Sequence, residues 1–148
     1  MHNIKIRKCK NSDLGDIEDI DKLCFPGANY PRFVLRQYYD LFPDLLMAAI
    51  INEEIIAYVA GGLDCQKRGW ALSLAVHPLY QNKGIGKKLL GKLIIRFEEI
   101  NTKIIILTVK PENKAAQAVC KDLGFKLINT ETDYFGDGDP RDVLELRI

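Results

Sequence analysis

The residues with the clearest chemical potential lie in a short polar stretch, Gln81 to Gly86, between an apolar segment and an amphipathic one. The apolar segment ends at Pro78, and the stretch itself carries two glycines, Gly84 and Gly86. The first N–H groups of a helix lack partners inside the helix and lie at the positive end of its dipole. Glycines at such a junction leave the backbone uncovered, so main chain alone can bind phosphate oxygens. The stretch therefore predicts an anion site where a strand is followed by a helix.

Spacing separates the phosphate-binding motifs to which such a loop could belong. A P-loop requires a glycine and a hydroxyl residue at the two positions held by Gln81 and Lys88. A dinucleotide-binding fingerprint requires a third glycine or alanine where Leu89 stands. Both motifs fail, and the pattern Gln-x-x-Gly-x-Gly remains. At this point an ordinary glycine-containing turn is still an alternative.

Overall charge gives no reason to expect a nucleic-acid partner. The chain has 21 basic and 20 acidic residues, which leaves a formal net charge of +1. Local charge is different, because four lysines cluster at the glycine loop and the segment after it: Lys83, Lys87, Lys88 and Lys92. They form either a solvated helix face or a basic patch that steers a polyanionic cofactor.

Length and cysteine usage limit the class of protein further. With 148 residues, 47% hydrophobic and 28% charged, the chain fits one globular domain spanning residues 1–148. Its four cysteines are widely spaced, without CxxC or a nearby histidine pair, so we expect neither a disulfide framework nor a metal site. Because no apolar run approaches 18 residues and no signal core opens the chain, we expect a cytoplasmic protein without a membrane partner.

Apolar periodicity predicts the elements that must position the loop. The order β-α-α-β-β-β-α-β-α-β-β indicates an α/β (α+β) domain with a central, mixed, mostly antiparallel sheet of about seven strands flanked by four helices. Gly61 and Gly62 favour a bulge or a close backbone approach. We expect helices over residues 14–24, 31–42, 84–100 and 114–123, and strands over 4–8, 45–51, 55–63, 70–77, 103–110, 126–135 and 143–148.

A second segment, Asn113 to Phe125, follows Gly86 by 27 residues, one helix and one strand later. Its pattern resembles Asn-x-x-Ala-x-x-x-Tyr-x-x-x-Gly-Phe of the GCN5-related N-acetyltransferase (GNAT) family. The glycine loop after a strand ending in Val-x-Pro resembles that family's acetyl-CoA pyrophosphate loop. The finer resemblance is to ribosomal-protein and protein N-terminal (RimI-like) acetyltransferases. Two motifs in the right order are far more specific than either alone.

The resemblance implies acetyl-CoA as the acyl donor and a set of residues that hold it. Main chain of one strand would contact the pantetheine arm and polarise the thioester, and loop amides would hold the pyrophosphate. Asn113 would hydrogen-bond the cofactor arm, although an asparagine here is equally typical of a helix N-cap. The implied cofactor-binding residues are Leu74, Ala75, Val76, Gln81, Asn82, Lys83, Gly84, Ile85, Gly86, Lys87 and Asn113.

The same resemblance implies an acceptor pocket built from two loops. Phe25, Pro26 and Tyr30 lie between the first two helices, where the family shapes the pocket for the first substrate residue. Tyr134 and Phe135 precede a turn and the last strand, and they resemble the family's Tyr-Tyr hairpin, which contacts peptide backbone. Packing of the loop onto the core is the alternative role for Phe25 and Tyr30.

Two positions depart from the family's catalytic pattern. Cys120 stands where the family has a tyrosine that protonates the leaving thiolate, and Thr108 stands where several members have a Glu or His base. We take Tyr134 and Cys120 as catalytic candidates, with packing as the preferred role of Cys120. Because an α-amine has a pKa of about 7.7–8.0, positioning beside a polarised thioester can supply much of the rate. A base acting through water remains open, with Glu54, Asp64 and Tyr134 as candidates and His77 interpreted as structural.

The resemblance thus implies an enzyme, an N-acetyltransferase that transfers acetyl from acetyl-CoA to a primary amine, with a protein or peptide N-terminus as the favoured acceptor. A small amine, such as a polyamine, amino acid or aminoglycoside, is the first alternative, for which the acids Asp137, Asp139 and Asp142 are relevant. A non-catalytic acyl-CoA-binding protein is the second, because of Cys120 and Thr108. We expect a monomer or homodimer.

Overall fold

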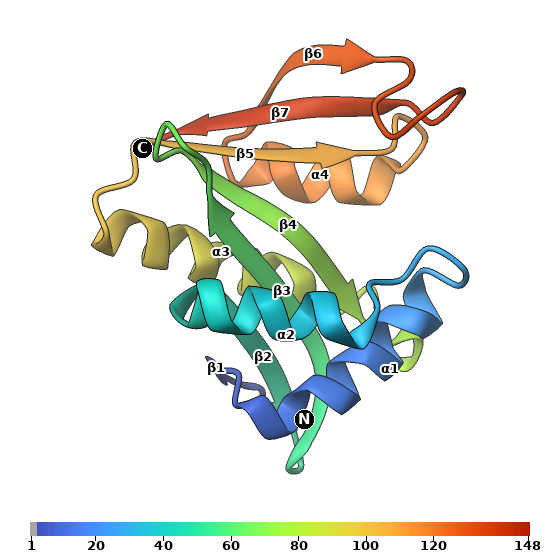
Figure 1. The fold of residues 1–148 in the computed structure, drawn as a ribbon, viewed down its shortest axis with the longest axis vertical. Helices are drawn as coiled ribbons and strands as arrows, with labels where there is room; N and C mark the ends of the chain where they lie inside the picture. The colour runs from blue at the N-terminus through green and yellow to red at the C-terminus, as the bar shows by residue number, and fades with distance from the viewer. Residues whose placement is uncertain (1–2) are drawn as a thin grey trace.

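A seven-stranded sheet in the order β1-β2-β3-β4-β5-β7-β6 runs through the computed structural model, which describes residues 3–148 (Figure 1). Helices α1 and α2 cover one face of the sheet, and α3 and α4 cover the other. The fold predicted from periodicity is confirmed, including the order of its elements. The strands are β1 (Lys5–Lys8), β2 (Leu46–Ile51), β3 (Glu54–Leu63), β4 (Gly69–Val76), β5 (Ile104–Val109), β6 (Lys126–Glu131) and β7 (Arg141–Arg147). The helices are α1 (Leu14–Cys24), α2 (Arg32–Leu41), α3 (Ile85–Glu99) and α4 (Lys114–Asp122).

Strands β4 and β5 are the one parallel pair in a sheet whose other neighbours are antiparallel. They pair only at Gly69 with Ile105 and at Trp70 with Ile106. Beyond these residues the two strands diverge, as Figure 1 shows from the end near the C-terminus outward. A gap therefore opens in the middle of the sheet, between two strands that both continue.

A β-bulge lies at the point where β4 leaves β5. Ala60 of β3 faces Ser73, while the next residue, Gly61, faces Ala71, so Leu72 is an extra residue on β4. A bulge bends its strand and increases the local twist, which accounts for the divergence. The bulge expected at Gly61 and Gly62 is thus present, although the extra residue belongs to the opposite strand.

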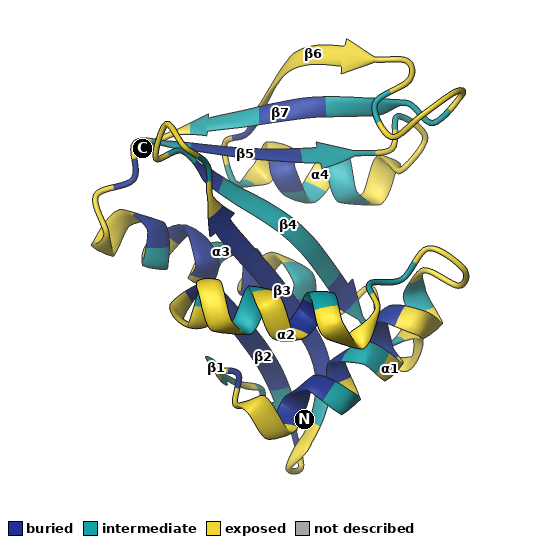
Figure 2. Cartoon of the chain, viewed as in Figure 1, coloured by how far each residue is buried: buried dark blue, intermediate teal, exposed yellow. Residues whose placement is uncertain are grey.

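The core is divided by the sheet into two layers, seen as dark blue in Figure 2. On one face, the predicted stripe of α3 is confirmed, because Ile85, Leu89, Leu93 and Phe97 are each at most 2% exposed. On the other face, Leu14, Ile17 and Leu35 from α1 and α2 pack around Tyr58 of β3. The bent sheet is held from both sides, which keeps the gap between β4 and β5 open.

The predicted end of the sixth strand is wrong. The strand expected over residues 126–135 ends at Glu131, and Tyr134 and Phe135 lie in turns that follow it. Residues 132–135 already belong to the turn that continues through Gly136 and Gly138, whose φ values of 122° and 72° are typical of glycine in turns. No helix within residues 3–148 combines the length and apolar content that crossing a bilayer requires.

Two glycines, Gly69 beside the Phe97 ring and Gly91 inside α3, give a test of this packing. A Cβ at Gly69 would lie 2.8 to 3.0 Å from three atoms of the buried Phe97 ring. A Cβ at Gly91, inside α3, would meet nothing within 4 Å. We expect Gly69→Ala to destabilise the protein by about 1–3 kcal/mol through overpacking. Gly91→Ala should instead stabilise it by about 0.5–1 kcal/mol, because glycine is a poor helix former. Urea unfolding of both variants measures the two effects, and equal signs would contradict the packing described.

Candidate active site

The glycine loop forms the junction that its composition predicts. Asn82 and Gly84 have positive φ values of 63° and 79°, and α3 begins directly after Gly84. No side chain caps the helix, and the first amide to bond within it is that of Lys88, to the Gly84 carbonyl oxygen at 3.1 Å. The preceding N–H groups of Ile85, Gly86 and Lys87 have no carbonyl one turn earlier in the helix. They form a cluster of donors at the positive end of a 15-residue helix.

The start of α3 packs directly on β4. A Cβ at Gly86 would lie 3.6 Å from the Leu74 side chain and 3.7 Å from the Val76 side chain. The backbone of the first turn of α3 therefore lies close to these two side chains of β4. The Gln81 side chain donates to the Val76 carbonyl oxygen at 2.9 Å. Gln81 thus ties the loop to the end of the strand, a role beyond the one its position in the motif implies. The anion site and the edge of β4 are therefore one continuous surface.

The edge of β4 offers main-chain groups where β5 has turned away. His77 N–H donates to the Ile56 carbonyl oxygen of β3, and strand alternation then places the main-chain groups of Val76 and Leu74 on the opposite edge. The Val76 carbonyl oxygen there accepts from Gln81 and, at 3.2 Å, from the Cys24 thiol. Within residues 3–148 no strand pairs with Leu74 on this edge. Ala75, by contrast, pairs with Tyr58 of β3 and is buried, so its main-chain groups are not available to a ligand at this edge.

Asn113 lies across the gap, at the start of α4. Its side-chain oxygen accepts from the Ala116 amide at 3.1 Å, which confirms the helix N-cap. The amide nitrogen of the same side chain is exposed and remains a donor. The cap orients this donor, so the capping role and the proposed contact with the cofactor arm are compatible.

The loop between α1 and α2 borders the other face of β4. Phe25 is 41% exposed, and Pro26 is exposed as well. Tyr30 is engaged in the structure: its hydroxyl donates to the carbonyl oxygen of the bulged Leu72 at 3.3 Å, and its ring meets Tyr38 edge-on. Burial raises the pKa of the Tyr30 phenol, so it stays protonated. Phe25 and Pro26 are therefore accessible to a ligand, whereas Tyr30 is held against β4 and α2 and has a mainly structural role in this loop.

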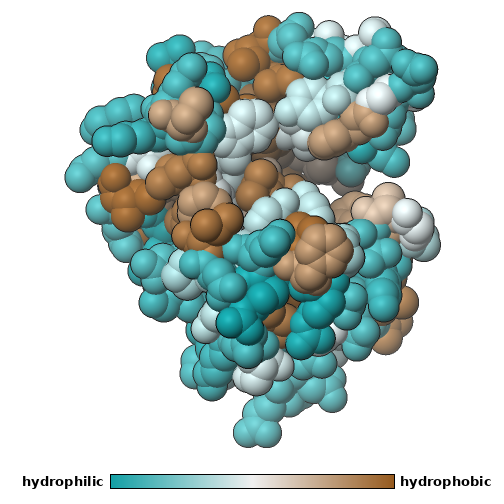
Figure 3. All heavy atoms as spheres, in the orientation of Figure 1, coloured by the Kyte–Doolittle hydropathy of each residue, from teal (hydrophilic) through white to brown (hydrophobic). Residues whose placement is uncertain are grey.

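The turn between β6 and β7 carries the other predicted acceptor residues. Tyr134 and Phe135 contact edge-to-face with centroids 4.7 Å apart, and Phe135 is 62% exposed. Arg141 lies over the Phe135 ring at 4.8 Å and pairs with Asp139 at 2.5 Å. Figure 3 shows the surface hollowed between the part built from β5 to β7 and the part built from α1 and α2. Both predicted acceptor loops border this hollow.

The acids near this turn are largely occupied. Asp142 accepts from Gln117 at 3.1 Å and from Thr130 at 2.8 Å, and Asp139 is paired with Arg141. Of the three acids considered for a polycationic small amine, only Asp139 has a cationic partner within residues 3–148, and the hydrogen bonds to Asp142 come from neutral groups that leave its charge in place.

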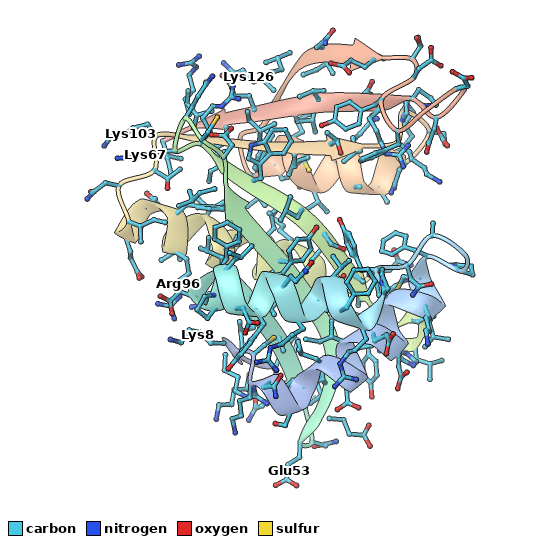
Figure 4. All side chains as sticks on the ribbon, in the orientation of Figure 1. Lys8, Glu53, Lys67, Arg96, Lys103 and Lys126 are labelled. Carbon is cyan, nitrogen blue, oxygen red and sulfur yellow. The ribbon has the colours of Figure 1, made fainter. Side chains whose placement is uncertain are left out.

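Three candidates for proton transfer lie outside the site or lack the required chemistry. Cys120 is 4% exposed in the core, and burial raises its pKa to about 11, so it is a packed thiol and a weak acid. Asp64 organises the turn between β3 and β4, where a hydrogen bond from Trp70 Nε1, together with bonds from Arg68, holds its pKa at about 2. Glu54 begins β3 beside Glu53, which Figure 4 places at the far tip of the molecule. Neither carboxylate is a useful base at the gap.

A buried polar network beside β4 was missed by sequence reasoning. Asp21 of α1 is 1% exposed, and its carboxylate accepts from the Tyr58 hydroxyl at 2.6 Å and from the Tyr30 amide at 2.7 Å. The Tyr58 hydroxyl lies 2.8 Å from the Ser73 hydroxyl on β4. One signal was available: Asp21 follows Ile17 by one helical turn, so it interrupts the apolar stripe of α1.

Basic side chains divide between the loop and the far end of the sheet. Lys67, Lys103 and Lys126 project at the end where β4 and β5 are still paired (Figure 4). Lys83, Lys87 and Lys88 belong to the glycine loop and the start of α3 instead. Only the second group lies where it can attract an anion to the unpaired amides.

The model of the acetyltransferase (GNAT) family matches residues 14–125. An N-alpha-acetyltransferase of Sulfurisphaera tokodaii is 26% identical over 91% of this chain and 87% of its own length. N-alpha-acetyltransferase 30 of Xenopus laevis is 31% identical over 80% of this chain and 44% of its own length. The chain thus spans less than half of that relative.

Solved structures show the same fold at lower identity. A chain of the NatC complex bound to Gag peptide and CoA superposes with a TM-score of 0.90, at 22% identity and 99% coverage of both chains. The ribosomal-protein-S18-alanine N-acetyltransferase of Escherichia coli superposes with a TM-score of 0.85, at 20% identity, over 99% of this chain and 94% of that one.

Thiol reactivity tests the role of Cys120. Burial raises the pKa of Cys120 to about 11 and that of Cys9 to about 12, so at pH 8 only about one Cys120 thiol in a thousand is the reactive thiolate. We expect iodoacetamide to label the exposed Cys65 and to spare Cys120 until the pH approaches 11, as read by mass spectrometry of tryptic peptides. All four cysteines should react in urea. Rapid labelling of Cys120 in the folded protein at pH 8 would instead indicate an activated thiol.

Proposed function

The chain belongs to the acetyltransferase (GNAT) family, and from this premise we propose that it acetylates the N-terminal α-amine of a protein or peptide with acetyl-CoA. The observation that carries the proposal is the parting of β4 from β5 beside the unpaired first turn of α3. The names of the relatives from Sulfurisphaera tokodaii and Xenopus laevis support an α-amine as acceptor. The cytoplasmic location and the monomeric or homodimeric state expected from the sequence stay predictions.

The residues around the gap fit acetyl-CoA. Its pyrophosphate requires donors without competing partners, which the amides of residues 85–87 supply, and Lys83 and Lys87 add attraction for the anion. Its pantetheine arm is amide-like, so it can pair with the main chain of Leu74 as an additional strand would. Asn113 supplies a further donor on the opposite side. Acetyl-CoA itself contributes the thioester that the amine attacks.

The acceptor would enter through the hollow between the two loops. The loop between α1 and α2, which carries Phe25 and Pro26, borders it on one side, and the turn between β6 and β7, which carries Tyr134 and Phe135, borders it on the other. With Cys120 buried and Thr108 unable to act as a base near neutral pH, an already neutral amine is the simplest nucleophile. An α-amine, with a pKa of about 7.7–8.0, meets this requirement better than a lysine side chain at about 10.4. Tyr134 is the proposed residue to contact the peptide or a proton-carrying water.

Release of free CoA tests the acceptor class. We expect turnover with short peptides that carry a free α-amine and an internal lysine, and mass spectrometry should locate a single acetyl group on the α-amine. At pH 7.5 the neutral fraction of an α-amine exceeds that of a lysine by a factor of several hundred. The rate constant kcat/KM should rise with pH until the α-amine is almost fully neutral, at about pH 9.

Blocked peptides, polyamines, amino acids and aminoglycosides complete this panel. A peptide with an acetylated α-amine should be inert, which is the matched control for the lysine side chain. Turnover of a small amine together with none of any peptide would contradict the proposed acceptor and leave the acyl donor intact. Binding of acetyl-CoA without turnover of any amine would indicate a non-catalytic acyl-CoA-binding protein.

Gly84 tests the donor site separately. A side chain at its φ of 79° is strained and would stand beside the unpaired amides, so Gly84→Val should abolish cofactor binding. For the unaltered protein, acetyl-CoA at 100 times its dissociation constant should add about 2.7 kcal/mol of stability, seen as a raised Tm. We expect no such rise for Gly84→Val.

Gly138→Val is the control, because Gly138 has a similar φ of 72° and equally open surroundings in the turn between β6 and β7. This variant carries the same kind of backbone strain and should keep the rise in Tm. Loss of the rise in both variants would point to a general loss of stability. A rise retained in Gly84→Val would contradict the assignment of the loop.

A further inference from the structure

Asp21 is a buried acid without a counter-ion. It is 1% exposed, and within residues 3–148 no Lys, Arg or His nitrogen lies at ion-pair distance from it. Its carboxylate oxygens accept from the Tyr30 amide and from the Tyr58 hydroxyl. A buried carboxylate is costly unless hydrogen-bonded or paired with a cation. The described residues therefore hold this carboxylate by hydrogen bonds alone.

The carboxylate sets the direction of the hydrogen bonds that lead away from it. Tyr58 has one hydroxyl proton, and it donates that proton to Asp21 at 2.6 Å. In the contact of 2.8 Å between Tyr58 and Ser73, the serine must therefore be the donor. Burial raises the pKa of the Tyr58 phenol, with the charge of Asp21 adding to the effect, so Tyr58 keeps this proton. With its own proton committed, the Ser73 oxygen presents only lone pairs to any further partner.

Ser73 lies on β4 next to the gap, where its lone pairs are available to a ligand. It follows the bulged Leu72 and precedes Leu74, whose main chain faces the gap. Its side chain lies on the face of β4 covered by α1 and α2, as its contact with Tyr58 in that core layer shows. It is half-buried, so part of it remains accessible. The neighbouring Tyr30 shares Asp21 with Tyr58 and contacts Leu72, which ties the acceptor loop to the same point of β4.

We propose that Ser73 binds the acceptor: its hydroxyl oxygen accepts a hydrogen bond from the amine nitrogen that is to be acetylated, and Asp21 and Tyr58 are positioning residues that hold it as an acceptor. The inference rests on the proposed function and adds to it the contact that orients the nucleophile. An amine that donates one N–H to Ser73 keeps its own lone pair free for the attack on the thioester. The ammonium form can bind in the same way, but it has no lone pair, so it must lose one proton to water before it attacks.

Paired ligands isolate this contact. Calorimetry on the protein saturated with CoA, which cannot react, compares a substrate peptide with its des-amino analogue, identical except for the missing α-amine. We expect the unaltered protein to bind the amine about 10- to 100-fold more tightly, as befits a hydrogen bond to a charged group. In Ser73→Ala this ratio should fall to near one, and kcat/KM should fall by a similar factor. Ser73→Thr keeps the hydroxyl and should retain most of both.

Tyr58→Phe is the second variant. Without the Tyr58 hydroxyl, the Ser73 proton is free to point toward the ligand. The ratio of affinities for the peptide and its des-amino analogue should therefore fall, although Ser73 is unchanged. Circular dichroism and the rise in Tm with acetyl-CoA show whether each variant is folded and binds the donor. A merely structural Ser73 would weaken both peptides equally and leave their ratio unchanged, and that result in the folded Ser73→Ala protein overturns the inference alone. Absence of turnover of any amine by the unaltered protein overturns the proposed function as well.

Discussion

The interruption of the sheet between β4 and β5 is the constraint on which the rest of the structure depends. Strands in a sheet satisfy each other's main-chain groups, and a strand that loses its neighbour in the interior must find another partner. The bulge at Leu72 separates the strands after two residue pairs, yet both continue to their ends. The two core layers hold the halves of the sheet in this arrangement. The gap is therefore a permanent feature of the fold, ready for an extended, amide-containing ligand.

The two faces of β4 have opposite electrostatic character. On one face, α3 directs its unpaired N–H groups at the end of the strand, with lysines of the loop nearby. On the other face, the buried carboxylate of Asp21, which has no ion-pair partner among residues 3–148, lies behind Tyr58 and Ser73. Under the proposed function, the anionic cofactor and the acceptor amine approach opposite sides of one strand. Such a separation lets both substrates bind at once and meet at the edge of β4, where proximity contributes to the rate.

The residues near the gap favour catalysis by positioning of the amine over catalysis by a dedicated general acid and base. Cys120 is a core residue, Asp64 maintains a distant turn, and Thr108 lies on β5 paired with Val143. An amine that is partly neutral at physiological pH needs orientation more than deprotonation. In the proposed site this orientation comes from Phe25 and Pro26 on one loop, Tyr134 and Phe135 on another, and Ser73 on the strand.

The amino-acid sequence by itself determined the order of elements, the helix stripe of residues 85–97 and the glycine loop, because these features are encoded by local periodicity and by residues with special backbone freedom. Local patterns also placed Asn113 at a helix start. Tertiary structure alone decided which strand carries the bulge, and it brought Asp21, Tyr58 and Ser73 together although 37 and 15 residues separate the hydrogen-bonded pairs. It also removed Glu54 and Asp64 from consideration as bases. Contacts between distant residues depend on how helices and strands pack, and no short-range pattern in the chain records that geometry.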